Sequence, residues 1–321
     1  MPEVISQARR LAGAIEPVAG QAQFSPECHA NYEALGFAPS PGMVGSTALP
    51  DKCGFFTSRG AVLGDVPAEV VAAVFAVFNP DEIVPIVRRG KDLANASTMW
   101  AARLDGAAAQ LRRILGSDPG RASWVADRLL HAADDLPLAG RALFAGQLAA
   151  EIPDDPIARL WRSADRLREF RGDSHVQAWS AAGFDPIEIG LLSDLYWGLA
   201  PRAHTRGRGW TEEQLDAGEE RLSAAGLLDG ESITERGREG TRSDRDLHGR
   251  CDVTRLGRAR RRLRADPRHP RALGHCDQGC GRIPHTFGAF HIRVGVNSWC
   301  RCSRSMLVPP IDPSLQFERN T

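Results

Sequence analysis

The chain of 321 residues is poor in lysine: Lys52 and Lys91 are the only lysines among its 40 basic residues, which leaves 38 arginines. Before residue 236 it has two cysteines, too few for a disulfide framework. Its longest mainly apolar stretch, residues 66–78, is too short to span a bilayer. The first 24 residues also lack the apolar core of a secretory signal. We therefore expect a cytoplasmic protein with no membrane-embedded part.

The motifs that define several large enzyme classes are missing as well. The sequence has no P-loop, no dinucleotide-binding fingerprint, no His-Glu-x-x-His metal motif and no nucleophile elbow. The enzyme classes defined by those motifs are therefore excluded. We expect no cofactor, and the sequence leans away from an enzyme.

Charge is divided unevenly along the chain. Residues 1–235 contain 22 basic and 32 acidic side chains, a net charge of −10, whereas residues 236–321 contain 18 and 8, a net charge of +10. The second part also has five of the seven cysteines and no sustained hydrophobic period. The overall charge of zero therefore hides two chemically different segments.

The first part has the composition and periodicity of a mostly α-helical globular protein. Serine, proline and glycine mark helix ends, as at Ser25-Pro26 and Gly36. Residues 38–65 lack a period and predict an ordered loop with one turn of structure inside it. The expected helices are 4–15, 25–35, 67–78, 80–89, 97–116, 123–134, 138–150, 155–171, 175–182 and 186–199.

A different pattern follows residue 210. Thr211 and Gln214 have the spacing of a capping box, and Gly226 is a typical helix stop. Residues 227–234 then predict a short hairpin around an Asp229-Gly230 turn, before another helix starts at Thr234. Helix, hairpin and helix in this order indicate a winged-helix-like module with a minimal β-hairpin.

Several segments together resemble an actinobacterial family of helix-turn-helix-like proteins with a MarR-type winged helix. The resemblance covers roughly the first three quarters of the chain and rests on four segments: Ser-Pro-Glu to Tyr-Glu-Ala-Leu-Gly (25–36), Arg-Gly-Asp-Ser-His with Ala-Trp (171–179), Glu-Ile-Gly-Leu-Leu and Leu-Tyr-Trp-Gly-Leu (188–199), and Trp-Thr-Glu-Glu to Thr-Glu-Arg-Gly-Arg (210–238). The resemblance implies a fold and no particular reaction. It also implies a homodimer, because such modules commonly pair through their terminal helices.

The family pattern would continue after residue 238 with an amphipathic helix, but here it stops. Reading the codons of residues 240–246 one base later can restore such a helix, so we expect a frameshifted tail. The predicted organisation is a helical domain (1–200), a truncated winged-helix-like module (201–240) and an irregular, disordered Arg- and Cys-rich tail (241–321). The coding DNA tests this, since stop codons in the shifted frame before residue 270 would refute it.

The most chemically suggestive cluster is residues 171–175, expected at a turn between two helices. Asp173 could orient the imidazole of His175 as a general base or ligand, and Arg171 and Trp179 would complete a small-molecule site. The alternative is structural. In that case Asp173 caps the following helix and His175 packs in its first turn.

A second candidate is an anion or DNA site before the helix that starts after Thr211. Arg202, Arg206 and Arg208 lie just ahead of this helix, whose N-terminal dipole favours anions. The helix itself carries Glu212, Glu213, Asp216, Glu219 and Glu220, and these repel phosphates. The alternative is a loop whose arginines pair with the acidic helix beside it.

The tail offers a weak candidate for zinc. Cys276, Cys280, Cys300 and Cys302 could form a tetrahedral site, but neither pair has the usual two-residue spacing. The arginine-rich run 255–271 could bind phosphates. Chance residues in an out-of-frame tail explain both patterns better, and we assign no metal.

The sequence thus predicts a ligand-sensing or regulatory protein with a MarR-like module that could bind DNA. The alternatives are a small-molecule enzyme with a pocket around Asp173 and His175, and a helical interaction scaffold without a ligand.

Overall fold

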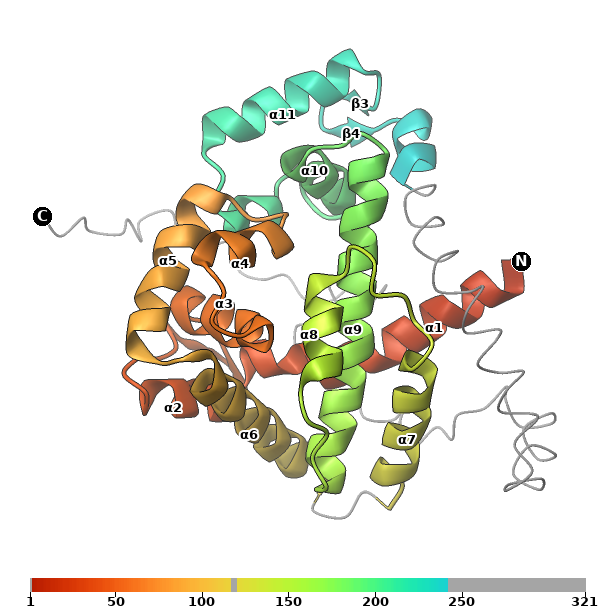
Figure 1. Ribbon diagram of the computed structural model, residues 1–321. Helices are drawn as coiled ribbons and strands as arrows, with labels where there is room; N and C mark the ends of the chain where they lie inside the picture. Colours follow the sequence, from red (N-terminus) through yellow and green to blue (C-terminus); the bar gives the residue numbers. More distant parts are fainter. Residues whose placement is uncertain (1, 117–119, 242–321) are drawn as a thin grey trace, which may run out of the picture.

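A computed structural model describes residues 2–116 and 120–241, and within them the chain is mostly helical, as predicted (Figure 1). The α-helices are α1 (Pro2–Ala19), α2 (Pro26–Glu33), α3 (Lys52–Gly60), α4 (Ala68–Val74), α5 (Pro80–Leu93), α6 (Ala96–Leu115), α7 (Ala122–Ala133), α8 (Ala142–Ala149), α9 (Pro156–Ala181), α10 (Pro186–Tyr196) and α11 (Glu212–Ala224). Short 3-10 helices are η1 (Gly20–Phe24), η2 (Ala61–Leu63) and η3 (Thr205–Arg208). Two antiparallel hairpins pair β1 (Met43–Val44) with β2 (Thr47–Ala48) and β3 (Leu228–Asp229) with β4 (Ser232–Ile233).

Helix α9 is the central element of the fold. Helices α1, α6, α7 and α8 pack directly against it, and Figure 1 shows it running along most of the molecule. Because α9 has neighbours around most of its circumference, polar as well as apolar residues of this helix are buried. Trp161, with no exposed surface, anchors the largest apolar core, which α1, α2, α6, α7 and α9 share.

Two smaller cores flank the first. One contains Phe56, Phe75 and Ile83 and lies between α3, α4 and α5, with Leu143 contributed by α8. The other joins α10, α11 and the β3–β4 hairpin through Ile187, Leu191, Leu192, Leu215, Leu222, Leu228 and Ile233. These three elements form one end of the molecule in Figure 1. None of the helices in the described residues is both long and apolar enough to cross a membrane.

Two predicted helix ends are confirmed. The Ser25 hydroxyl accepts a hydrogen bond from the backbone N–H of Cys28 and so begins α2. Thr211 and Gln214 cap α11 reciprocally, each side chain bonded to the other's backbone N–H. Both caps satisfy N–H groups that a first helical turn leaves without partners.

The prediction of a loop over residues 38–65 was wrong in its second half, which contains α3. Asp51 caps this helix through the N–H of Gly54. The two glycines that obscured the helical signal are sites of close packing: a Cβ on Gly54 would lie 3.0 Å from Tyr32, and one on Gly60 would lie 2.8 Å from Val71. Tertiary packing therefore outweighs the low helix propensity of glycine here.

Helix α1 also runs past its predicted end at Glu16-Pro17. Ile15 and Ala19 on either side of that proline are buried in the main core, and α1 packs against α9. Burial of the last turn explains why the proline lies within the helix. Residues 242–321 lie outside the described residues. They include the arginine-rich run 255–271, the four cysteines of the zinc candidate and almost all of the segment expected to be frameshifted.

Candidate functional site

The cluster at residues 171–175 lies inside α9, so the predicted turn between two helices was wrong. Gly172, Asp173 and Ser174 favour turns by propensity, but the continuous helix Pro156–Ala181 buries the last two. The Ser174 hydroxyl donates to the Phe170 carbonyl one turn earlier, at 2.8 Å. Its polar side chain is thus satisfied within the helix, and packing decides the conformation.

Asp173 caps a different helix from the one predicted. Its Oδ2 accepts a hydrogen bond from the backbone N–H of Phe144 at 2.9 Å, in the first turn of α8, whose own N-cap residue Arg141 makes no side-chain cap. Burial raises the pKa of Asp173 to about 6, even though the Phe144 N–H opposes the rise. The carboxyl group therefore links α9 to the start of α8.

The other residues of this predicted site are directed to different places. Arg171 pairs with Glu16 of α1, and Trp179 is buried with its Nε1 lacking a partner among the described residues. His175 is half-buried. Residues two apart on a helix do not face each other, so α9 does not hold the Asp173 carboxylate against the His175 ring.

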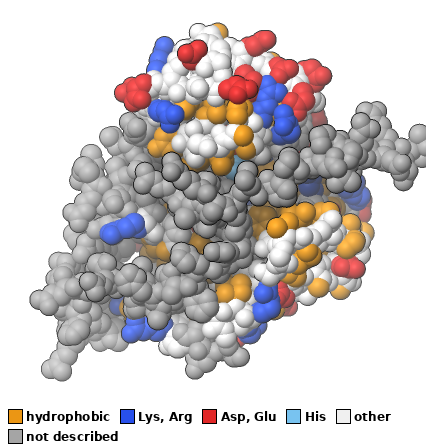
Figure 2. Space-filling model, turned by 180° about the vertical axis from the view of Figure 1, so that it is seen from behind, with side chains coloured by type: hydrophobic (Ala, Val, Ile, Leu, Met, Phe, Trp, Pro, Cys, Tyr) orange, Lys and Arg blue, Asp and Glu red, His pale blue; other side chains and the backbone are white. Residues whose placement is uncertain are grey.

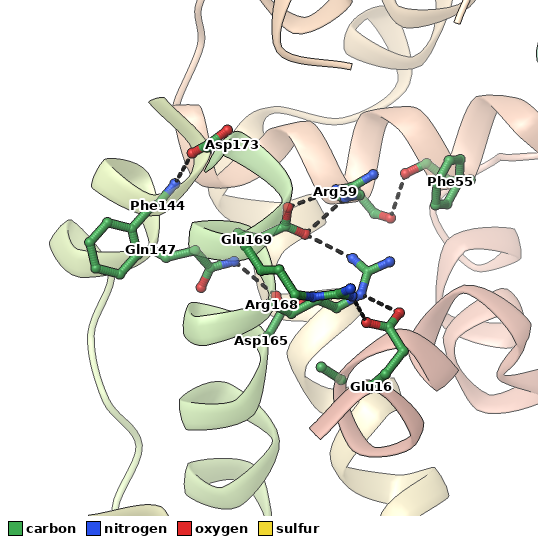
Figure 3. Close-up of polar contacts among 12 residues, drawn as sticks. Glu16, Phe55, Arg59, Phe144, Gln147, Asp165, Arg168, Glu169 and Asp173 are labelled. Atoms are coloured by element: carbon green, nitrogen blue, oxygen red, sulfur yellow. Dashed lines mark hydrogen bonds and ion pairs between the residues drawn. The ribbon is translucent and has the colours of Figure 1, made fainter. Parts of the chain in front are cut away.

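A buried ion-pair network lies one to two turns earlier on α9 (Figure 3). Glu169 accepts two hydrogen bonds from Arg59 of α3, from Nε at 2.8 Å and Nη2 at 2.7 Å. Arg168 bridges Glu169 and Glu16 at 3.0 and 2.9 Å. Burial alone would raise the pKa of Glu169, but the charge and hydrogen bonds of Arg59 hold it at about 2. Glu169 is therefore a permanent anion that joins α1, α3 and α9.

A second buried pair follows on the same face. Gln147 of α8 donates to Asp165 Oδ2 at 2.8 Å and accepts from Arg162. Burial lowers the pKa of Arg162 to about 10, and its guanidinium lies 5.0 Å from the centre of the Trp100 ring. Burial also raises the pKa of Asp165, so Asp165 and Glu169 have opposite shifts on adjacent turns.

Sequence reasoning missed these residues. The available signal was the spacing of four charged residues at positions i, i+3, i+4 and i+7, which share one face of a helix: Arg162, Asp165, Arg166 and Glu169. A charged face is normally solvated. Only the packing of other helices around α9 reveals that this one is inside the protein.

The predicted anion site is occupied by the protein's own acidic groups. Arg202, in a left-handed conformation at φ 61°, donates to Glu212, Asp216 and Glu219 of α11 at 2.6–2.8 Å. Arg206 also pairs with Glu212, at 2.8 Å. Thr211 uses its hydroxyl in the helix cap. The alternative reading, arginines paired with the acidic helix beside them, is what the structure contains.

Arg208 points back toward α10. A Cβ on Gly190 of α10 would lie 2.9 Å from its Nη1, and burial lowers the pKa of Arg208. Asp194 of α10 fixes the same segment, because its Oδ2 accepts from the backbone N–H and hydroxyl of Thr205 at 3.1 and 2.7 Å. Its Oδ1 lies 3.1 Å from His204 Nδ1. The connection between α10 and α11 is thus held tightly.

The helical body contacts this connection at one corner. Asn79, at the start of α5, donates from its backbone N–H to the Arg208 carbonyl and from its side chain to the Gly209 carbonyl, both at 2.9 Å. Trp210 Nε1 donates to the Val77 carbonyl at 3.1 Å. The α4–α5 corner therefore bonds to the residues that lead directly into α11.

Helices α10 and α11 are joined by residues 197–211, which include η3, and are followed by the β3–β4 hairpin. Two packed helices followed by a small hairpin are the elements of a helix-turn-helix protein with a wing. The sequence matches the Helix-turn-helix family over residues 8–245, and the chain belongs to this family. No curated protein and no solved structure gives a significant match.

Proposed function

We propose that this chain is a non-enzymatic regulatory protein that senses a ligand in its helical body and acts through protein contacts of its helix-turn-helix unit, rather than by reading a DNA sequence. The proposal depends on one observation above all. Arg202 and Arg206, which precede α11, are already paired with its acidic side chains, and Arg221 of α11 pairs with Asp185 and Glu188 at the start of α10.

The charge of the whole unit supports this. Residues 183–241 contain twelve acidic and six basic side chains, a net charge of −6. Figure 2 shows red acidic groups spread over this end of the molecule, with few blue ones between them. A helix that enters the major groove must approach phosphates closely, and here both long-range and local charge oppose that approach.

Communication with the body is supported by the corner at Asn79. Asn79 donates hydrogen bonds to the carbonyls of Arg208 and Gly209, so a change in the packing of α4 and α5 would shift these residues, which lie just before α11. The MarR-like features that we propose, ligand sensing and pairing of two copies through the helix that begins at residue 235, fit this arrangement. Analytical ultracentrifugation of the full chain tests the pairing.

Fluorescence anisotropy with labelled duplex from the region upstream of the gene tests the main proposal. At physiological salt we expect a Kd no tighter than the roughly 10⁻⁴–10⁻⁶ M typical of non-specific binding, equal for a shuffled duplex. Sequence-specific binding below about 10⁻⁷ M, lost on shuffling, would overturn the proposal.

The second candidate is DNA binding, favoured by the family and by the location of Arg202 and Arg206 at the start of α11. Under this candidate the Glu212→Gln and Glu219→Gln changes remove the ionised partner of Arg206 and two of the three ionised partners of Arg202, and so tighten binding. Glu231→Gln at the hairpin, a matched control, does so less. Under the first proposal none of the three variants gains sequence specificity.

A further inference from the structure

Three polar side chains in the interior lack hydrogen-bond partners. They are Arg103 of α6 and Tyr32 of α2, each 2% exposed, and Asp165 of α9, 1% exposed. Among the described residues Arg103 Nε and Nη1, the Tyr32 hydroxyl and Asp165 Oδ1 have no well-aligned hydrogen-bond partner, although Ser58 and Arg103 lie close enough to the Tyr32 hydroxyl to oppose the rise in its pKa. A buried polar group without a partner is costly, and an unpaired buried charge more so. Three such side chains in the interior indicate a bound ion or ligand near them.

The three groups lie in one region. Helix α6 packs directly against both α2 and α9. Burial raises the pKa values of Tyr32 and Asp165, and in both cases the Arg103 guanidinium opposes the rise, as it can only from close by. The same guanidinium lies 5.5 Å from the centre of the Trp161 ring in the main core. The Tyr32 hydroxyl and the Asp165 carboxyl group therefore both lie near the Arg103 guanidinium.

Charge in this region is unbalanced. Around the buried face of α9, six arginines (Arg59, Arg103, Arg141, Arg162, Arg166 and Arg168) stand against four carboxyl groups (Glu16, Asp165, Glu169 and Asp173). Glu169 and Glu16 already bind other arginines, and burial raises the pKa values of Asp165 and Asp173. Within this group of arginines, Arg103 is the one whose Nε and Nη1 both lack an acceptor. Because arginines outnumber carboxyl groups here, we expect the acceptor missing from Arg103 to carry a negative charge.

We propose that Arg103 Nε and Nη1 together with the Tyr32 hydroxyl bind a single monovalent anion of about the size of chloride, with Asp165 Oδ1 beside it. The directly packed helices favour a monatomic ion over a molecule. Asp165 in its protonated form would add a second O–H donor beside that of Tyr32, whereas its ionised form would repel the anion. The site thus combines a cation and neutral hydroxyl donors, with no ionised carboxylate bonded to it. This inference is independent of what α11 contacts.

Thermal unfolding of the full chain tests the site. The protein is dialysed into halide-free buffer, and the unfolding midpoint is measured as sodium chloride replaces sodium gluconate at constant ionic strength. We expect the midpoint to rise and then saturate with chloride, because an ion that binds only the folded state stabilises it by mass action. Bromide should act in the same way, and crystals grown with bromide should show an anomalous peak between Arg103 and Tyr32.

Variants locate the effect. Tyr32→Phe removes one donor without changing the packing, so the apparent affinity for chloride should fall about tenfold, while stability in gluconate stays close to that of the wild type. Arg103→Gln should abolish the response. Arg113→Gln, on the same helix but in a 45%-exposed surface pair with Glu27, is the control and should respond like the wild type.

Equal midpoints in chloride and gluconate would overturn the inference, as would an unchanged chloride response in Tyr32→Phe. A water molecule at the site with no bromide peak would do the same. If Arg103→Gln fails to fold, Tyr32→Phe alone decides the question. None of these outcomes bears on DNA or protein binding by α11.

Discussion

Arg59 and Glu169 form a two-pronged ion pair between α3 and α9, although they are 110 positions apart in the chain. The Glu169 side chain is 1% exposed and that of Arg59 is 16% exposed. Bidentate geometry and burial both strengthen such a pair, and removing one partner leaves the other charge inside the protein. This contact therefore fixes the position of α3, the helix that sequence periodicity did not reveal.

Glu169→Gln should destabilise the protein at pH 7 by about 3–5 kcal/mol, because Arg59 and Arg168 lose their buried counterion. The pKa of Glu169 in the folded protein, about 2, is below its ordinary value of 4.5. Its stabilising effect is therefore complete above pH 4.5 and is lost as the pH falls toward 2. Urea unfolding from pH 2.5 to 7 should show this acid-dependent loss in the wild type and not in the variant. Asp127→Asn, which removes a 60%-exposed partner of Arg159, should cost less than about 1 kcal/mol.

Asp173 should have the opposite pH dependence. Burial raises its pKa from 3.8 to about 6, so the folded protein binds this proton more tightly than the unfolded chain does. The contribution of Asp173 to stability therefore decreases as the pH rises from about 4 to about 6. In Asp173→Asn the amide oxygen can still accept from the Phe144 N–H, so the variant should retain the cap and lose this pH dependence. Asp173→Ala should lose the cap too, and with it about 1 kcal/mol at every pH. Identical pH profiles of the wild type and Asp173→Asn would contradict the assigned environment.

The sequence was sufficient wherever one local signal controls the structure. Serine before proline at 25–26 and the Thr211–Gln214 spacing predicted the starts of α2 and α11, and Asp229-Gly230 predicted the hairpin turn. The sequence failed wherever distant packing outweighs propensity, as in α3 and at residues 171–175. The candidate site suffered most, because the partners of Asp173 and Asp165 come from α8 and that of Glu169 comes from α3. The sequence of α9 alone does not predict which residues these partners are.

Two glycines in helices should respond to alanine in opposite ways. A Cβ on Gly106 of α6 would lie 2.5 Å from the Cα and 2.7 Å from the backbone N of Cys28, so α2 and α6 would have to separate. Gly106→Ala should therefore cost about 1–3 kcal/mol. A Cβ on Gly172 of α9 would meet nothing closer than 3.7 Å. Since alanine favours a helix interior, Gly172→Ala should stabilise by up to about 1 kcal/mol.

The Gly172 variant also distinguishes a continuous α9 from the turn expected from sequence. At a turn requiring a positive φ, alanine would strain the backbone and destabilise the protein. Equilibrium unfolding of both variants, followed by far-UV circular dichroism, measures the two free energies. Destabilisation by Gly172→Ala would argue against an unbroken helix through residues 171–175.

One of the three hydrogen bonds that link the α4–α5 corner to the segment before α11 can be removed by changing one atom. Asn79 accepts from the Asp81 N–H as the N-cap of α5 and donates to the Gly209 carbonyl before α11. Asn79→Asp keeps the cap but replaces the donor with an oxygen that repels that carbonyl. Hydrogen exchange followed by mass spectrometry should then be faster in residues 212–224, while α9 keeps its protection. Asn95→Asp at the start of α6, where the side chain also caps a helix, is the matched control and should leave α11 unchanged. Because the side-chain bond of Asn79 reaches only the segment before α11, unchanged exchange of residues 212–224 in Asn79→Asp would mean that this bond does not control the helix.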